Sequence, residues 1–176
     1  MELFTNSGLN AELLSLIERA GVTGYAHFKP LFSLMYNLGL RANELEWWYT
    51  WELTENENVI VLTSKNGNLR HIPFDNFTPE AQYTIQTGEL SFYLPKYETI
   101  QKTFNYIAPH RYIVKSKNCN THIFRHNRIK QLYQQGLDTT QVKTYMGIRS
   151  NSTALTYKNS QVYYTTNYKA KPPFTL

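Results

Sequence analysis

The chain has 176 residues, of which 41% are hydrophobic and 18% charged, so it is long enough for one domain with a hydrophobic core, with or without a tail. The net charge of +5 suits a polyanionic partner, although many ordinary proteins are as basic. A single cysteine, Cys119, excludes an internal disulfide framework, and no apolar run approaches the roughly 20 residues of a membrane span. The N-terminus lacks the basic and apolar regions of a signal peptide. We therefore predict a soluble intracellular protein.

The first part of the chain reads as helical and then changes to a hairpin. Apolar spacing predicts helices over residues 10–20, 25–37 and 42–48. Residues 59–62 and 69–73 have the composition of two strands, and the Asn66-Gly67 pair between them is typical of a tight turn.

The second part of the chain is predicted to be helical almost throughout. Pro79 has the position of a first helical residue, and residues 97–107 form a further predicted helix. Three more predicted helices are one capped by Thr121 and running to Gln135, one from Thr139 or Thr140 to Met146, and one over 152–157. Residues after Asn159 are read as a polar, Tyr-rich tail. The predicted fold class is mainly α with a small antiparallel β-sheet (α+β).

His122 and Arg125 are the first residues that indicate chemistry. Three residues apart at the start of a helix, they share one face, where free backbone N–H groups favour an anion such as phosphate. By itself such a pair is more often an ordinary helix start. Cys119, His122 and His126 also have a spacing that could hold zinc, but they offer three ligands and no clear fourth. The phosphate interpretation of His122 is therefore favoured.

Arg41, Lys65 and Tyr157 supply the other residue types that metal-free phosphodiester transfer needs. Two guanidinium groups can hold the non-bridging oxygens and offset charge in the transition state. A lysine can protonate the leaving oxygen, and a tyrosine hydroxyl can attack phosphorus to form a phosphotyrosine. A histidine can hold or move a proton near neutral pH.

Four boxes in this order resemble the tyrosine recombinases, the phage integrase family. Residues 38–45 (LGLRANEL) are similar to the family's first box, and Lys65 followed by residues 69–73 (LRHIP) to its β-hairpin lysine and strand. Residues 121–126 (THIFRH) are similar to the box of the second arginine, and residues 147–157 (GIRSNSTALTY) to the box that ends in the tyrosine. The resemblance covers about residues 10 to 160 and implies a tyrosine recombinase catalytic domain over 1–160.

The resemblance implies a role for five residues. Arg41 and Arg125 would clamp the phosphate, Lys65 would be the general acid, His122 would handle a proton, and Tyr157 would be the nucleophile. The implied enzyme is a DNA strand transferase, a site-specific integrase that cleaves and rejoins DNA through a 3′-phosphotyrosine. Because the ester conserves bond energy, neither ATP nor a metal cofactor is implied.

Two features depart from the family pattern. Ile148 stands where the family usually has His or Trp, and Ile cannot donate a hydrogen bond to the scissile phosphate. The family usually carries a core-binding domain before the catalytic one, and the stretch before residue 38 is too short for it, so we expect that domain to be absent from this chain.

The resemblance also implies partners. The expected partner is double-stranded DNA, with a homo-tetramer on DNA, a monomer or dimer without it, and no membrane association. Residues 161–176 are expected to be a C-terminal tail, either loose or exchanged between protomers. The expected location is with DNA in a bacterial or archaeal cytoplasm or a virus-infected host. Alternatives are a catalytically lapsed DNA-binding regulator and a type IB topoisomerase or telomere resolvase.

Overall fold

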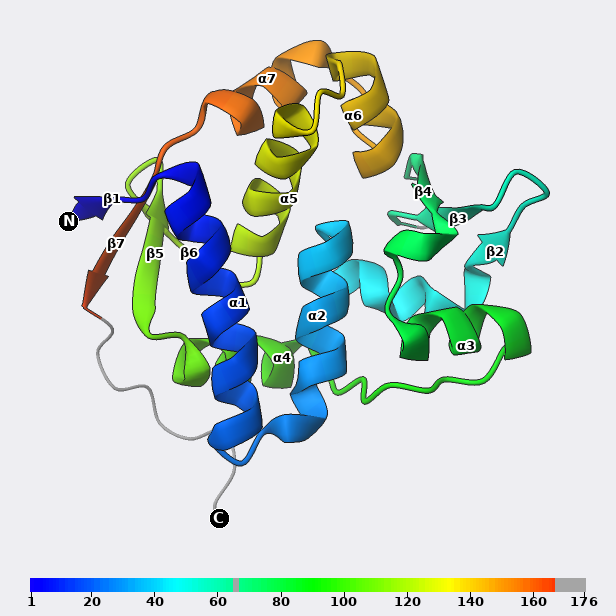
Figure 1. The fold of residues 1–176 in the computed structure, drawn as a ribbon, viewed down its shortest axis with the longest axis horizontal. Coiled ribbons are helices and arrows are strands. Elements are labelled where there is room, and N and C mark those ends of the chain that lie inside the picture. The colour runs from blue at the N-terminus through cyan, green and yellow to red at the C-terminus, as the bar shows by residue number, and fades with distance from the viewer. Residues whose placement is uncertain (65–66, 167–176) are drawn as a thin grey trace.

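The computed structural model describes residues 1–64 and 67–166 and shows a helical body with an antiparallel sheet on either side (Figure 1). The body contains α1 (Asn6–Val22), α2 (Lys29–Leu38), α4 (Tyr97–Ile107) and α5 (Ile123–Gln134). The mainly α fold class with small antiparallel sheets is confirmed. No helix within the described ranges is long and apolar enough to cross a membrane.

The N-terminal helices follow the predicted order with shifted ends. Thr5 caps α1 by accepting a hydrogen bond from the Gly8 backbone N–H, so the helix begins earlier than predicted. The predicted helix over 25–37 divides into a 3₁₀ turn η1 (Ala26–Phe28) and α2, because Pro30 lies in the first turn of α2, where its missing N–H costs nothing.

Aromatic side chains join α2, α4 and α5 in the centre of the body. The rings of Phe32, Phe104 and Phe124, one from each helix, are fully buried, with centroids 5.6 to 6.2 Å apart. Aromatic rings bury large apolar areas, and these separations are typical of favourable ring pairs. This cluster fixes α5, the helix that carries Arg125 and His126 and begins at His122.

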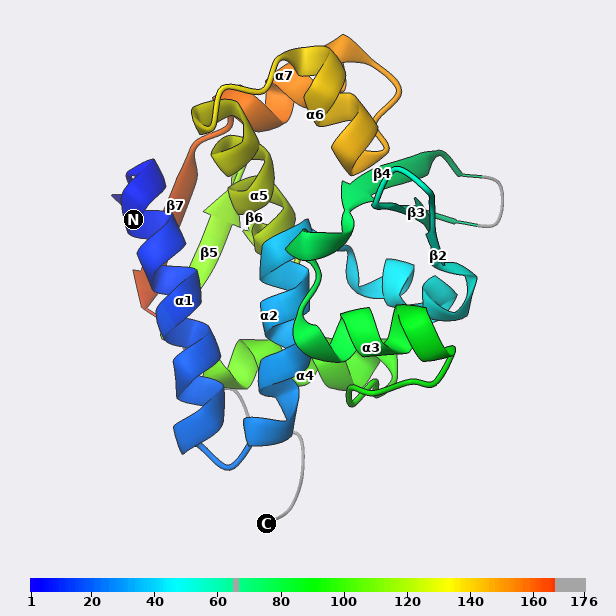
Figure 2. The ribbon, with the colours of Figure 1, turned by 45° about the vertical axis from the view of Figure 1, so that its right-hand side comes forward.

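The predicted hairpin forms part of a three-stranded sheet, with strand order β2-β3-β4. Its strands are β2 (Glu52–Leu53), β3 (Asn58–Leu62) and β4 (Leu69–Pro73). Val59, Val61 and Ile72 are buried, in keeping with the alternation expected of a sheet that covers a core with one face. The chain enters this sheet through η2 (Ala42–Thr50), a 3₁₀ helix where an α-helix was predicted, and leaves it through η3 (Phe74–Asn76) and α3 (Pro79–Thr87). Figure 2 shows α3 beside the sheet.

A second, four-stranded sheet was not predicted. Its order is β1-β7-β5-β6, and every neighbouring pair is antiparallel. The strands are β1 (Glu2–Leu3), β5 (His110–Val114), β6 (Lys117–Cys119) and β7 (Val162–Thr166). Residues 162–166 were read as tail and instead pair with β5 and β1 of the same chain, because Val162 can bury its side chain there. Residues 167–176 lie outside the described part.

Two short helices complete the fold above α5 (Figure 1). They are α6 (Thr139–Met146), as predicted, and α7 (Asn151–Asn159), longer than predicted. Each begins at a side-chain cap: Asp138 accepts a hydrogen bond from Gln141 N, and Ser150 accepts one from Thr153 N. The α6–α7 connection starts at Gly147, whose φ is +69° and where a Cβ would lie 2.7 Å from Arg70 Cγ. Only glycine fits this turn.

Candidate functional site

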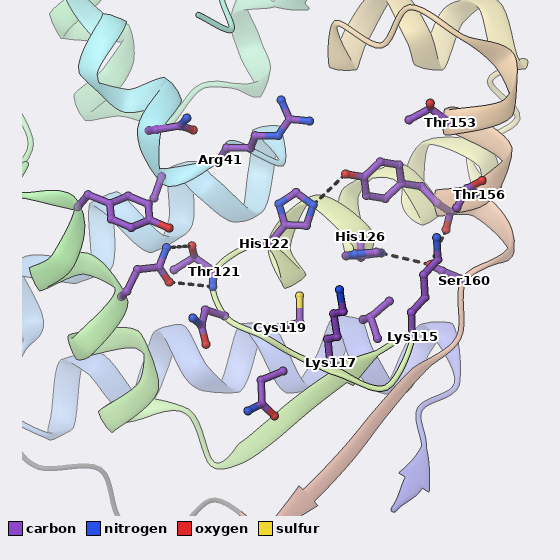
Figure 3. Close-up of a pocket in the computed structure, with 18 of the residues that line it drawn as sticks. Arg41, Lys115, Lys117, Cys119, Thr121, His122, His126, Thr153, Thr156 and Ser160 are labelled. Carbon is purple, nitrogen blue, oxygen red and sulfur yellow. Dashed lines mark hydrogen bonds between the residues drawn. The ribbon is translucent and has the colours of Figure 1, made fainter.

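A cavity of about 1070 Å³ lies where η2, α5, α7 and the β5–β6 hairpin meet. Its lining includes three of the five residues for which the resemblance implies a role, namely Arg41, His122 and Tyr157. Figure 3 shows side chains from all of these elements facing the cavity. The fold thus brings together Arg41 and Tyr157, which are 116 residues apart in the sequence.

A hydrogen bond joins the candidate nucleophile to the candidate proton-handling group. His122 Nε2 lies 2.8 Å from the Tyr157 hydroxyl oxygen, and a dashed line from His122 in Figure 3 marks this contact. His122 is the N-cap of α5, so the helix start holds the ring at the cavity wall. Thr121, the predicted cap, is instead buried, and its Oγ1 accepts a hydrogen bond from Gln101 Nε2 at 2.7 Å.

The surroundings of His122 keep its imidazole neutral at neutral pH. Burial, together with the nearby positive charges of Arg125 and Arg41, lowers the pKa of His122 to about 4, and Glu44 acts in the opposite direction. A neutral imidazole has one unprotonated nitrogen, so His122 can accept the proton of the tyrosine hydroxyl. The pair therefore has the protonation state that activation of a phenol requires.

Arg41 reaches the cavity from the start of η2. Its backbone N–H donates to Glu44 Oε1 at 2.8 Å, which fixes the turn from which the side chain extends. Arg41 is half-buried and lines the cavity opposite Thr153 and Thr156 of α7 (Figure 3). A guanidinium at this place can bind an oxyanion that enters the cavity.

Arg125 is held beneath this surface by a buried carboxylate. Glu44 is fully buried, and its oxygens lie 3.3 Å from Arg70 Nη1 and 3.6 Å from Arg125 Nη1. Arg70 is also fully buried and donates to the Tyr145 backbone oxygen at 2.9 Å. One carboxylate therefore faces two guanidiniums, which leaves a net positive charge at the base of the site.

The Tyr157 ring covers Arg125. The Arg125 guanidinium carbon lies 5.6 Å from the ring centroid, and Arg125 is 1% exposed. Burial lowers the pKa of Arg125 to about 10, with Arg70 adding to the effect and Glu44 opposing it, so Arg125 stays charged at neutral pH. Its Nε and Nη1 groups make no hydrogen bond to any described residue. Buried donors without a hydrogen bond are costly, and a phosphate oxygen could accept hydrogen bonds from both.

The end of α7 is fastened to α5 by two further side chains. Lys130 is buried, and its ammonium donates to the backbone oxygens of Lys158, at 3.1 Å, and of Ser160. His126 Nδ1 lies 3.2 Å from Ser160 Oγ, and the His126 ring is 4.8 Å from the Tyr157 ring. A cation that binds the last carbonyls of a helix stabilises that helix end. These contacts fix the position of the helix that carries Tyr157.

Two singled-out positions in the described part of the chain, Arg125 and Ile148, are not among the residues that line the cavity. Lys65 lies outside the described residues, so its role remains a prediction; Asn68, at the base of its hairpin, donates from Nδ2 to the Gly147 carbonyl at 3.1 Å. Ile148 is half-buried against the hydrophobic core and is not among the residues that line the cavity. As for zinc, no group of three or more His, Cys, Asp or Glu residues in the described ranges could hold a metal ion.

Sequence reasoning missed several residues of the site. Glu44 belongs to the first box, but only the fold shows that it links Arg70 to Arg125. Lys115 and Lys117 line the cavity, but their place there was not expected because the hairpin that carries them was not predicted. Tyr112 and Val114 are two residues apart and both buried, and this alternating pattern was the available signal for that strand.

Comparisons with known proteins give the family and support the fold. The chain belongs to the phage integrase family, whose model matches residues 10–163. A solved structure titled "Crystal structure of XerA recombinase" is similar, with a TM-score of 0.57 and 16% sequence identity over 85% of this chain and 58% of that chain. At this identity the likeness concerns the fold, and this chain spans little more than half of the XerA chain. No curated protein matches the sequence.

Proposed function

We propose that this protein is a site-specific DNA recombinase that cleaves and rejoins DNA strands through a phosphotyrosine at Tyr157. The observation that carries the proposal is the 2.8 Å hydrogen bond between His122 Nε2 and the Tyr157 hydroxyl, beside Arg41 and above Arg125. Family membership supports it, because tyrosine recombinases use a tyrosine nucleophile in this box.

The proposed first step is attack of the Tyr157 oxygen on the scissile phosphorus. The hydroxyl proton passes to His122, a bond forms between the tyrosine oxygen and phosphorus, and the bond to the 5′-oxygen breaks. Lys65 is the proposed donor of the proton that the leaving 5′-oxygen takes up. Arg41 and Arg125 would offset charge on the non-bridging oxygens. Attack by a 5′-hydroxyl of another strand reverses these steps, so neither ATP nor a metal ion is needed.

Binding of the phosphate by Arg125 requires a movement of Tyr157. In the described conformation the ring lies over the guanidinium, which is 1% exposed. We propose that a DNA phosphate takes the place of the ring face on Arg125, while the tyrosine oxygen turns to the phosphorus. The Nε and Nη1 groups of Arg125, which make no hydrogen bond to any described residue, would then gain one, which favours the change.

The proposed partner is double-stranded DNA, with four protomers assembled on it and a monomer or dimer without it. The proposal includes an exchange of residues 161–176 between neighbouring protomers. Because β7 pairs with β5 in its own chain, exchange would require those ladder hydrogen bonds to be replaced by equivalent ones from a neighbour. Multi-angle light scattering with and without DNA tests the assembly.

Covalent trapping tests the chemistry. Incubation with nicked suicide duplexes should give a protein–DNA band that survives SDS, since loss of the short cleaved strand prevents religation. Tyr157→Phe is the control and should give none. If the duplexes come from the ends of the protein's own element and bind, yet no band appears, the strand-transfer proposal fails.

A DNA-binding regulator is the second candidate. Ile148 favours it, because the residue at this position cannot donate a hydrogen bond and packs against the core. Loss of one transition-state donor commonly costs about 10² to 10³ in rate. Site-specific DNA binding without any covalent band, at every incubation time, would support this candidate over the enzyme.

A further inference from the structure

The β5–β6 hairpin turns through two residues in a left-handed conformation. Val114 pairs with Lys117, so Lys115 and Ser116 alone form the loop. Their φ angles are +51° and +62°. Two successive residues of positive φ form the tight turn that suits the twist of a hairpin, and Asn-Gly is the pair that adopts it most readily.

Lysine is an unfavourable choice for this turn. A Cβ atom crowds the neighbouring carbonyl in the left-handed region, so glycine or asparagine would fold here more easily than Lys115 and Ser116. Strained residues of this kind cluster at functional sites, where the position of the side chain matters more than the local conformation. A functional reason for this unfavourable turn would therefore lie in what the Lys115 side chain faces.

Lys115 and Lys117 both face the cavity of the candidate site. Each lines it, and Figure 3 shows the two side chains rising from the hairpin toward His126 and Ser160. Both are exposed, and neither forms an ion pair with any residue in the described part of the chain. Burial, with a smaller contribution from Lys115 among other positive charges, lowers the pKa of His126 to about 3.

The opposite wall consists of hydroxyl groups from α7. These belong to Ser152, Thr153 and Thr156, at positions that share a helix face, and Ser160 follows just after the helix. Hydroxyl and ammonium groups are both common ligands of DNA phosphates. Among the described residues that line the cavity, Glu46 is the one acidic side chain.

We propose that the β5–β6 hairpin is a DNA-backbone clamp in which Lys115 and Lys117 bind phosphates that flank the scissile phosphate of the cleaved strand. The α7 hydroxyls would contact the same strand from the other wall. The clamp rests on the proposed function, because it assumes that the strand carrying the scissile phosphate enters this cavity. It adds a binding element that is separate from the residues at the reacting phosphorus.

The turn itself provides a matched pair of variants. Lys115→Asn removes the charge but suits the left-handed conformation, and Ser116→Gly relieves the same turn without altering charge. Both variants should therefore unfold at a denaturant concentration equal to or above that of the parent. Lys29→Gln, on α2 and outside the cavity, controls for loss of any positive charge.

The decisive measurement is the salt dependence of affinity for a plain DNA duplex, made in a Tyr157→Phe background so that no covalent bond forms. Each lost phosphate contact should lower the slope of log K against log salt by about 0.9. We expect this reduction for Lys115→Asn, about twice as much for Lys115→Asn with Lys117→Thr, and none for Ser116→Gly or Lys29→Gln.

The outcomes separate the clamp from the proposed function. A folded Lys115→Asn protein with the parental slope would overturn the clamp, and covalent trapping by the wild-type protein would still uphold strand transfer. An equal loss of affinity in Ser116→Gly would also overturn it, because turn shape and not charge would then govern binding. A parent that binds no DNA at low salt would overturn both.

Discussion

The Nε2 atom of His122 lies 2.8 Å from the hydroxyl oxygen of Tyr157, although 35 residues separate them. The two side chains come from the N-cap of α5 and from α7, and Lys130 and His126 hold these two helices together at the C-terminal end of α7, next to Tyr157. The pair is thus built into the packing of the fold. Its burial keeps His122 neutral and able to accept a proton.

Removal of the His122 imidazole should slow DNA cleavage. We expect His122→Ala to reduce the rate of covalent adduct formation by about 10² to 10⁴, the usual contribution of a positioned acid–base group. His27→Ala, which removes an exposed histidine outside the cavity, should leave the rate unchanged. Equal rates for His122→Ala and the wild type, measured by quenched-flow trapping, would show that His122 does not take the proton.

Removal of the Tyr157 ring should expose Arg125 to anions. A cation–π contact contributes about 0.5 to 2 kcal/mol, so Tyr157→Ala should bind inorganic phosphate about 2- to 30-fold more tightly than Tyr157→Phe, which keeps the ring. Calorimetric titration, or the NMR shift of the Arg125 Nε–H, measures this difference. The same affinity in both variants would mean that the ring does not cover the anion site.

Neutralisation of Glu44 should destabilise the whole fold. Glu44 is the shared partner of Arg70 and Arg125, and all three are buried. Removing one member of a buried ion pair leaves an uncompensated charge, so Glu44→Gln should lower the free energy of unfolding by about 3 to 5 kcal/mol. Glu46→Gln, at an exposed position, should change it by about 0.5 kcal/mol or less in urea titrations. A similar small effect at Glu44 would refute its linking role.

Stability should decrease as the pH falls below neutrality. Burial, with nearby positive charges, holds the pKa of His122 at about 4 and that of His126 at about 3. An unfolded chain has a histidine pKa of about 6.5, so the unfolded state binds more protons below that pH and the free energy of unfolding decreases.

The urea concentration at the unfolding midpoint, measured between about pH 7 and about pH 5.5, tests this effect. In this range the histidines titrate and most carboxylates do not. His126→Gln removes one of the two contributing groups, so its midpoint should fall less steeply than that of the wild type. The groups that bear on His126 are His122, Lys130, Arg125 and Lys115, and all remain in this variant. An unchanged slope would mean that His126 titrates normally in the folded protein.

Local patterns predicted the helices and the β3–β4 hairpin, because caps, turns and apolar spacing act over a few residues. Thr121 was predicted to cap α5. In the structure its side chain is hydrogen-bonded to Gln101, and His122 is the N-cap residue instead. The strand over 162–166 was missed for a similar reason, since its partners in β1 and β5 are distant in sequence. Pairing of this kind depends on tertiary contacts.

The site was predicted in part. The resemblance to the family implied that Arg41, His122 and Tyr157 act at one phosphate, and the structure brings all three to one cavity. The covering of Arg125 by Tyr157 and the link through Glu44 could not be predicted, because both depend on how α7 and η2 pack against α5. The β5–β6 hairpin was not predicted, and the place of its lysines at the cavity could not be predicted without it.

Mass spectrometry of the trapped protein–DNA adduct tests the central claim most directly. After nuclease and protease digestion of the suicide-substrate reaction, we expect a nucleotide attached through its 3′-phosphate to the peptide that contains Tyr157, and no such peptide from Tyr157→Phe. An adduct on another residue, attachment through a 5′-phosphate, or bound but uncleaved cognate DNA would contradict the proposal that Tyr157 is the nucleophile of a DNA strand transferase.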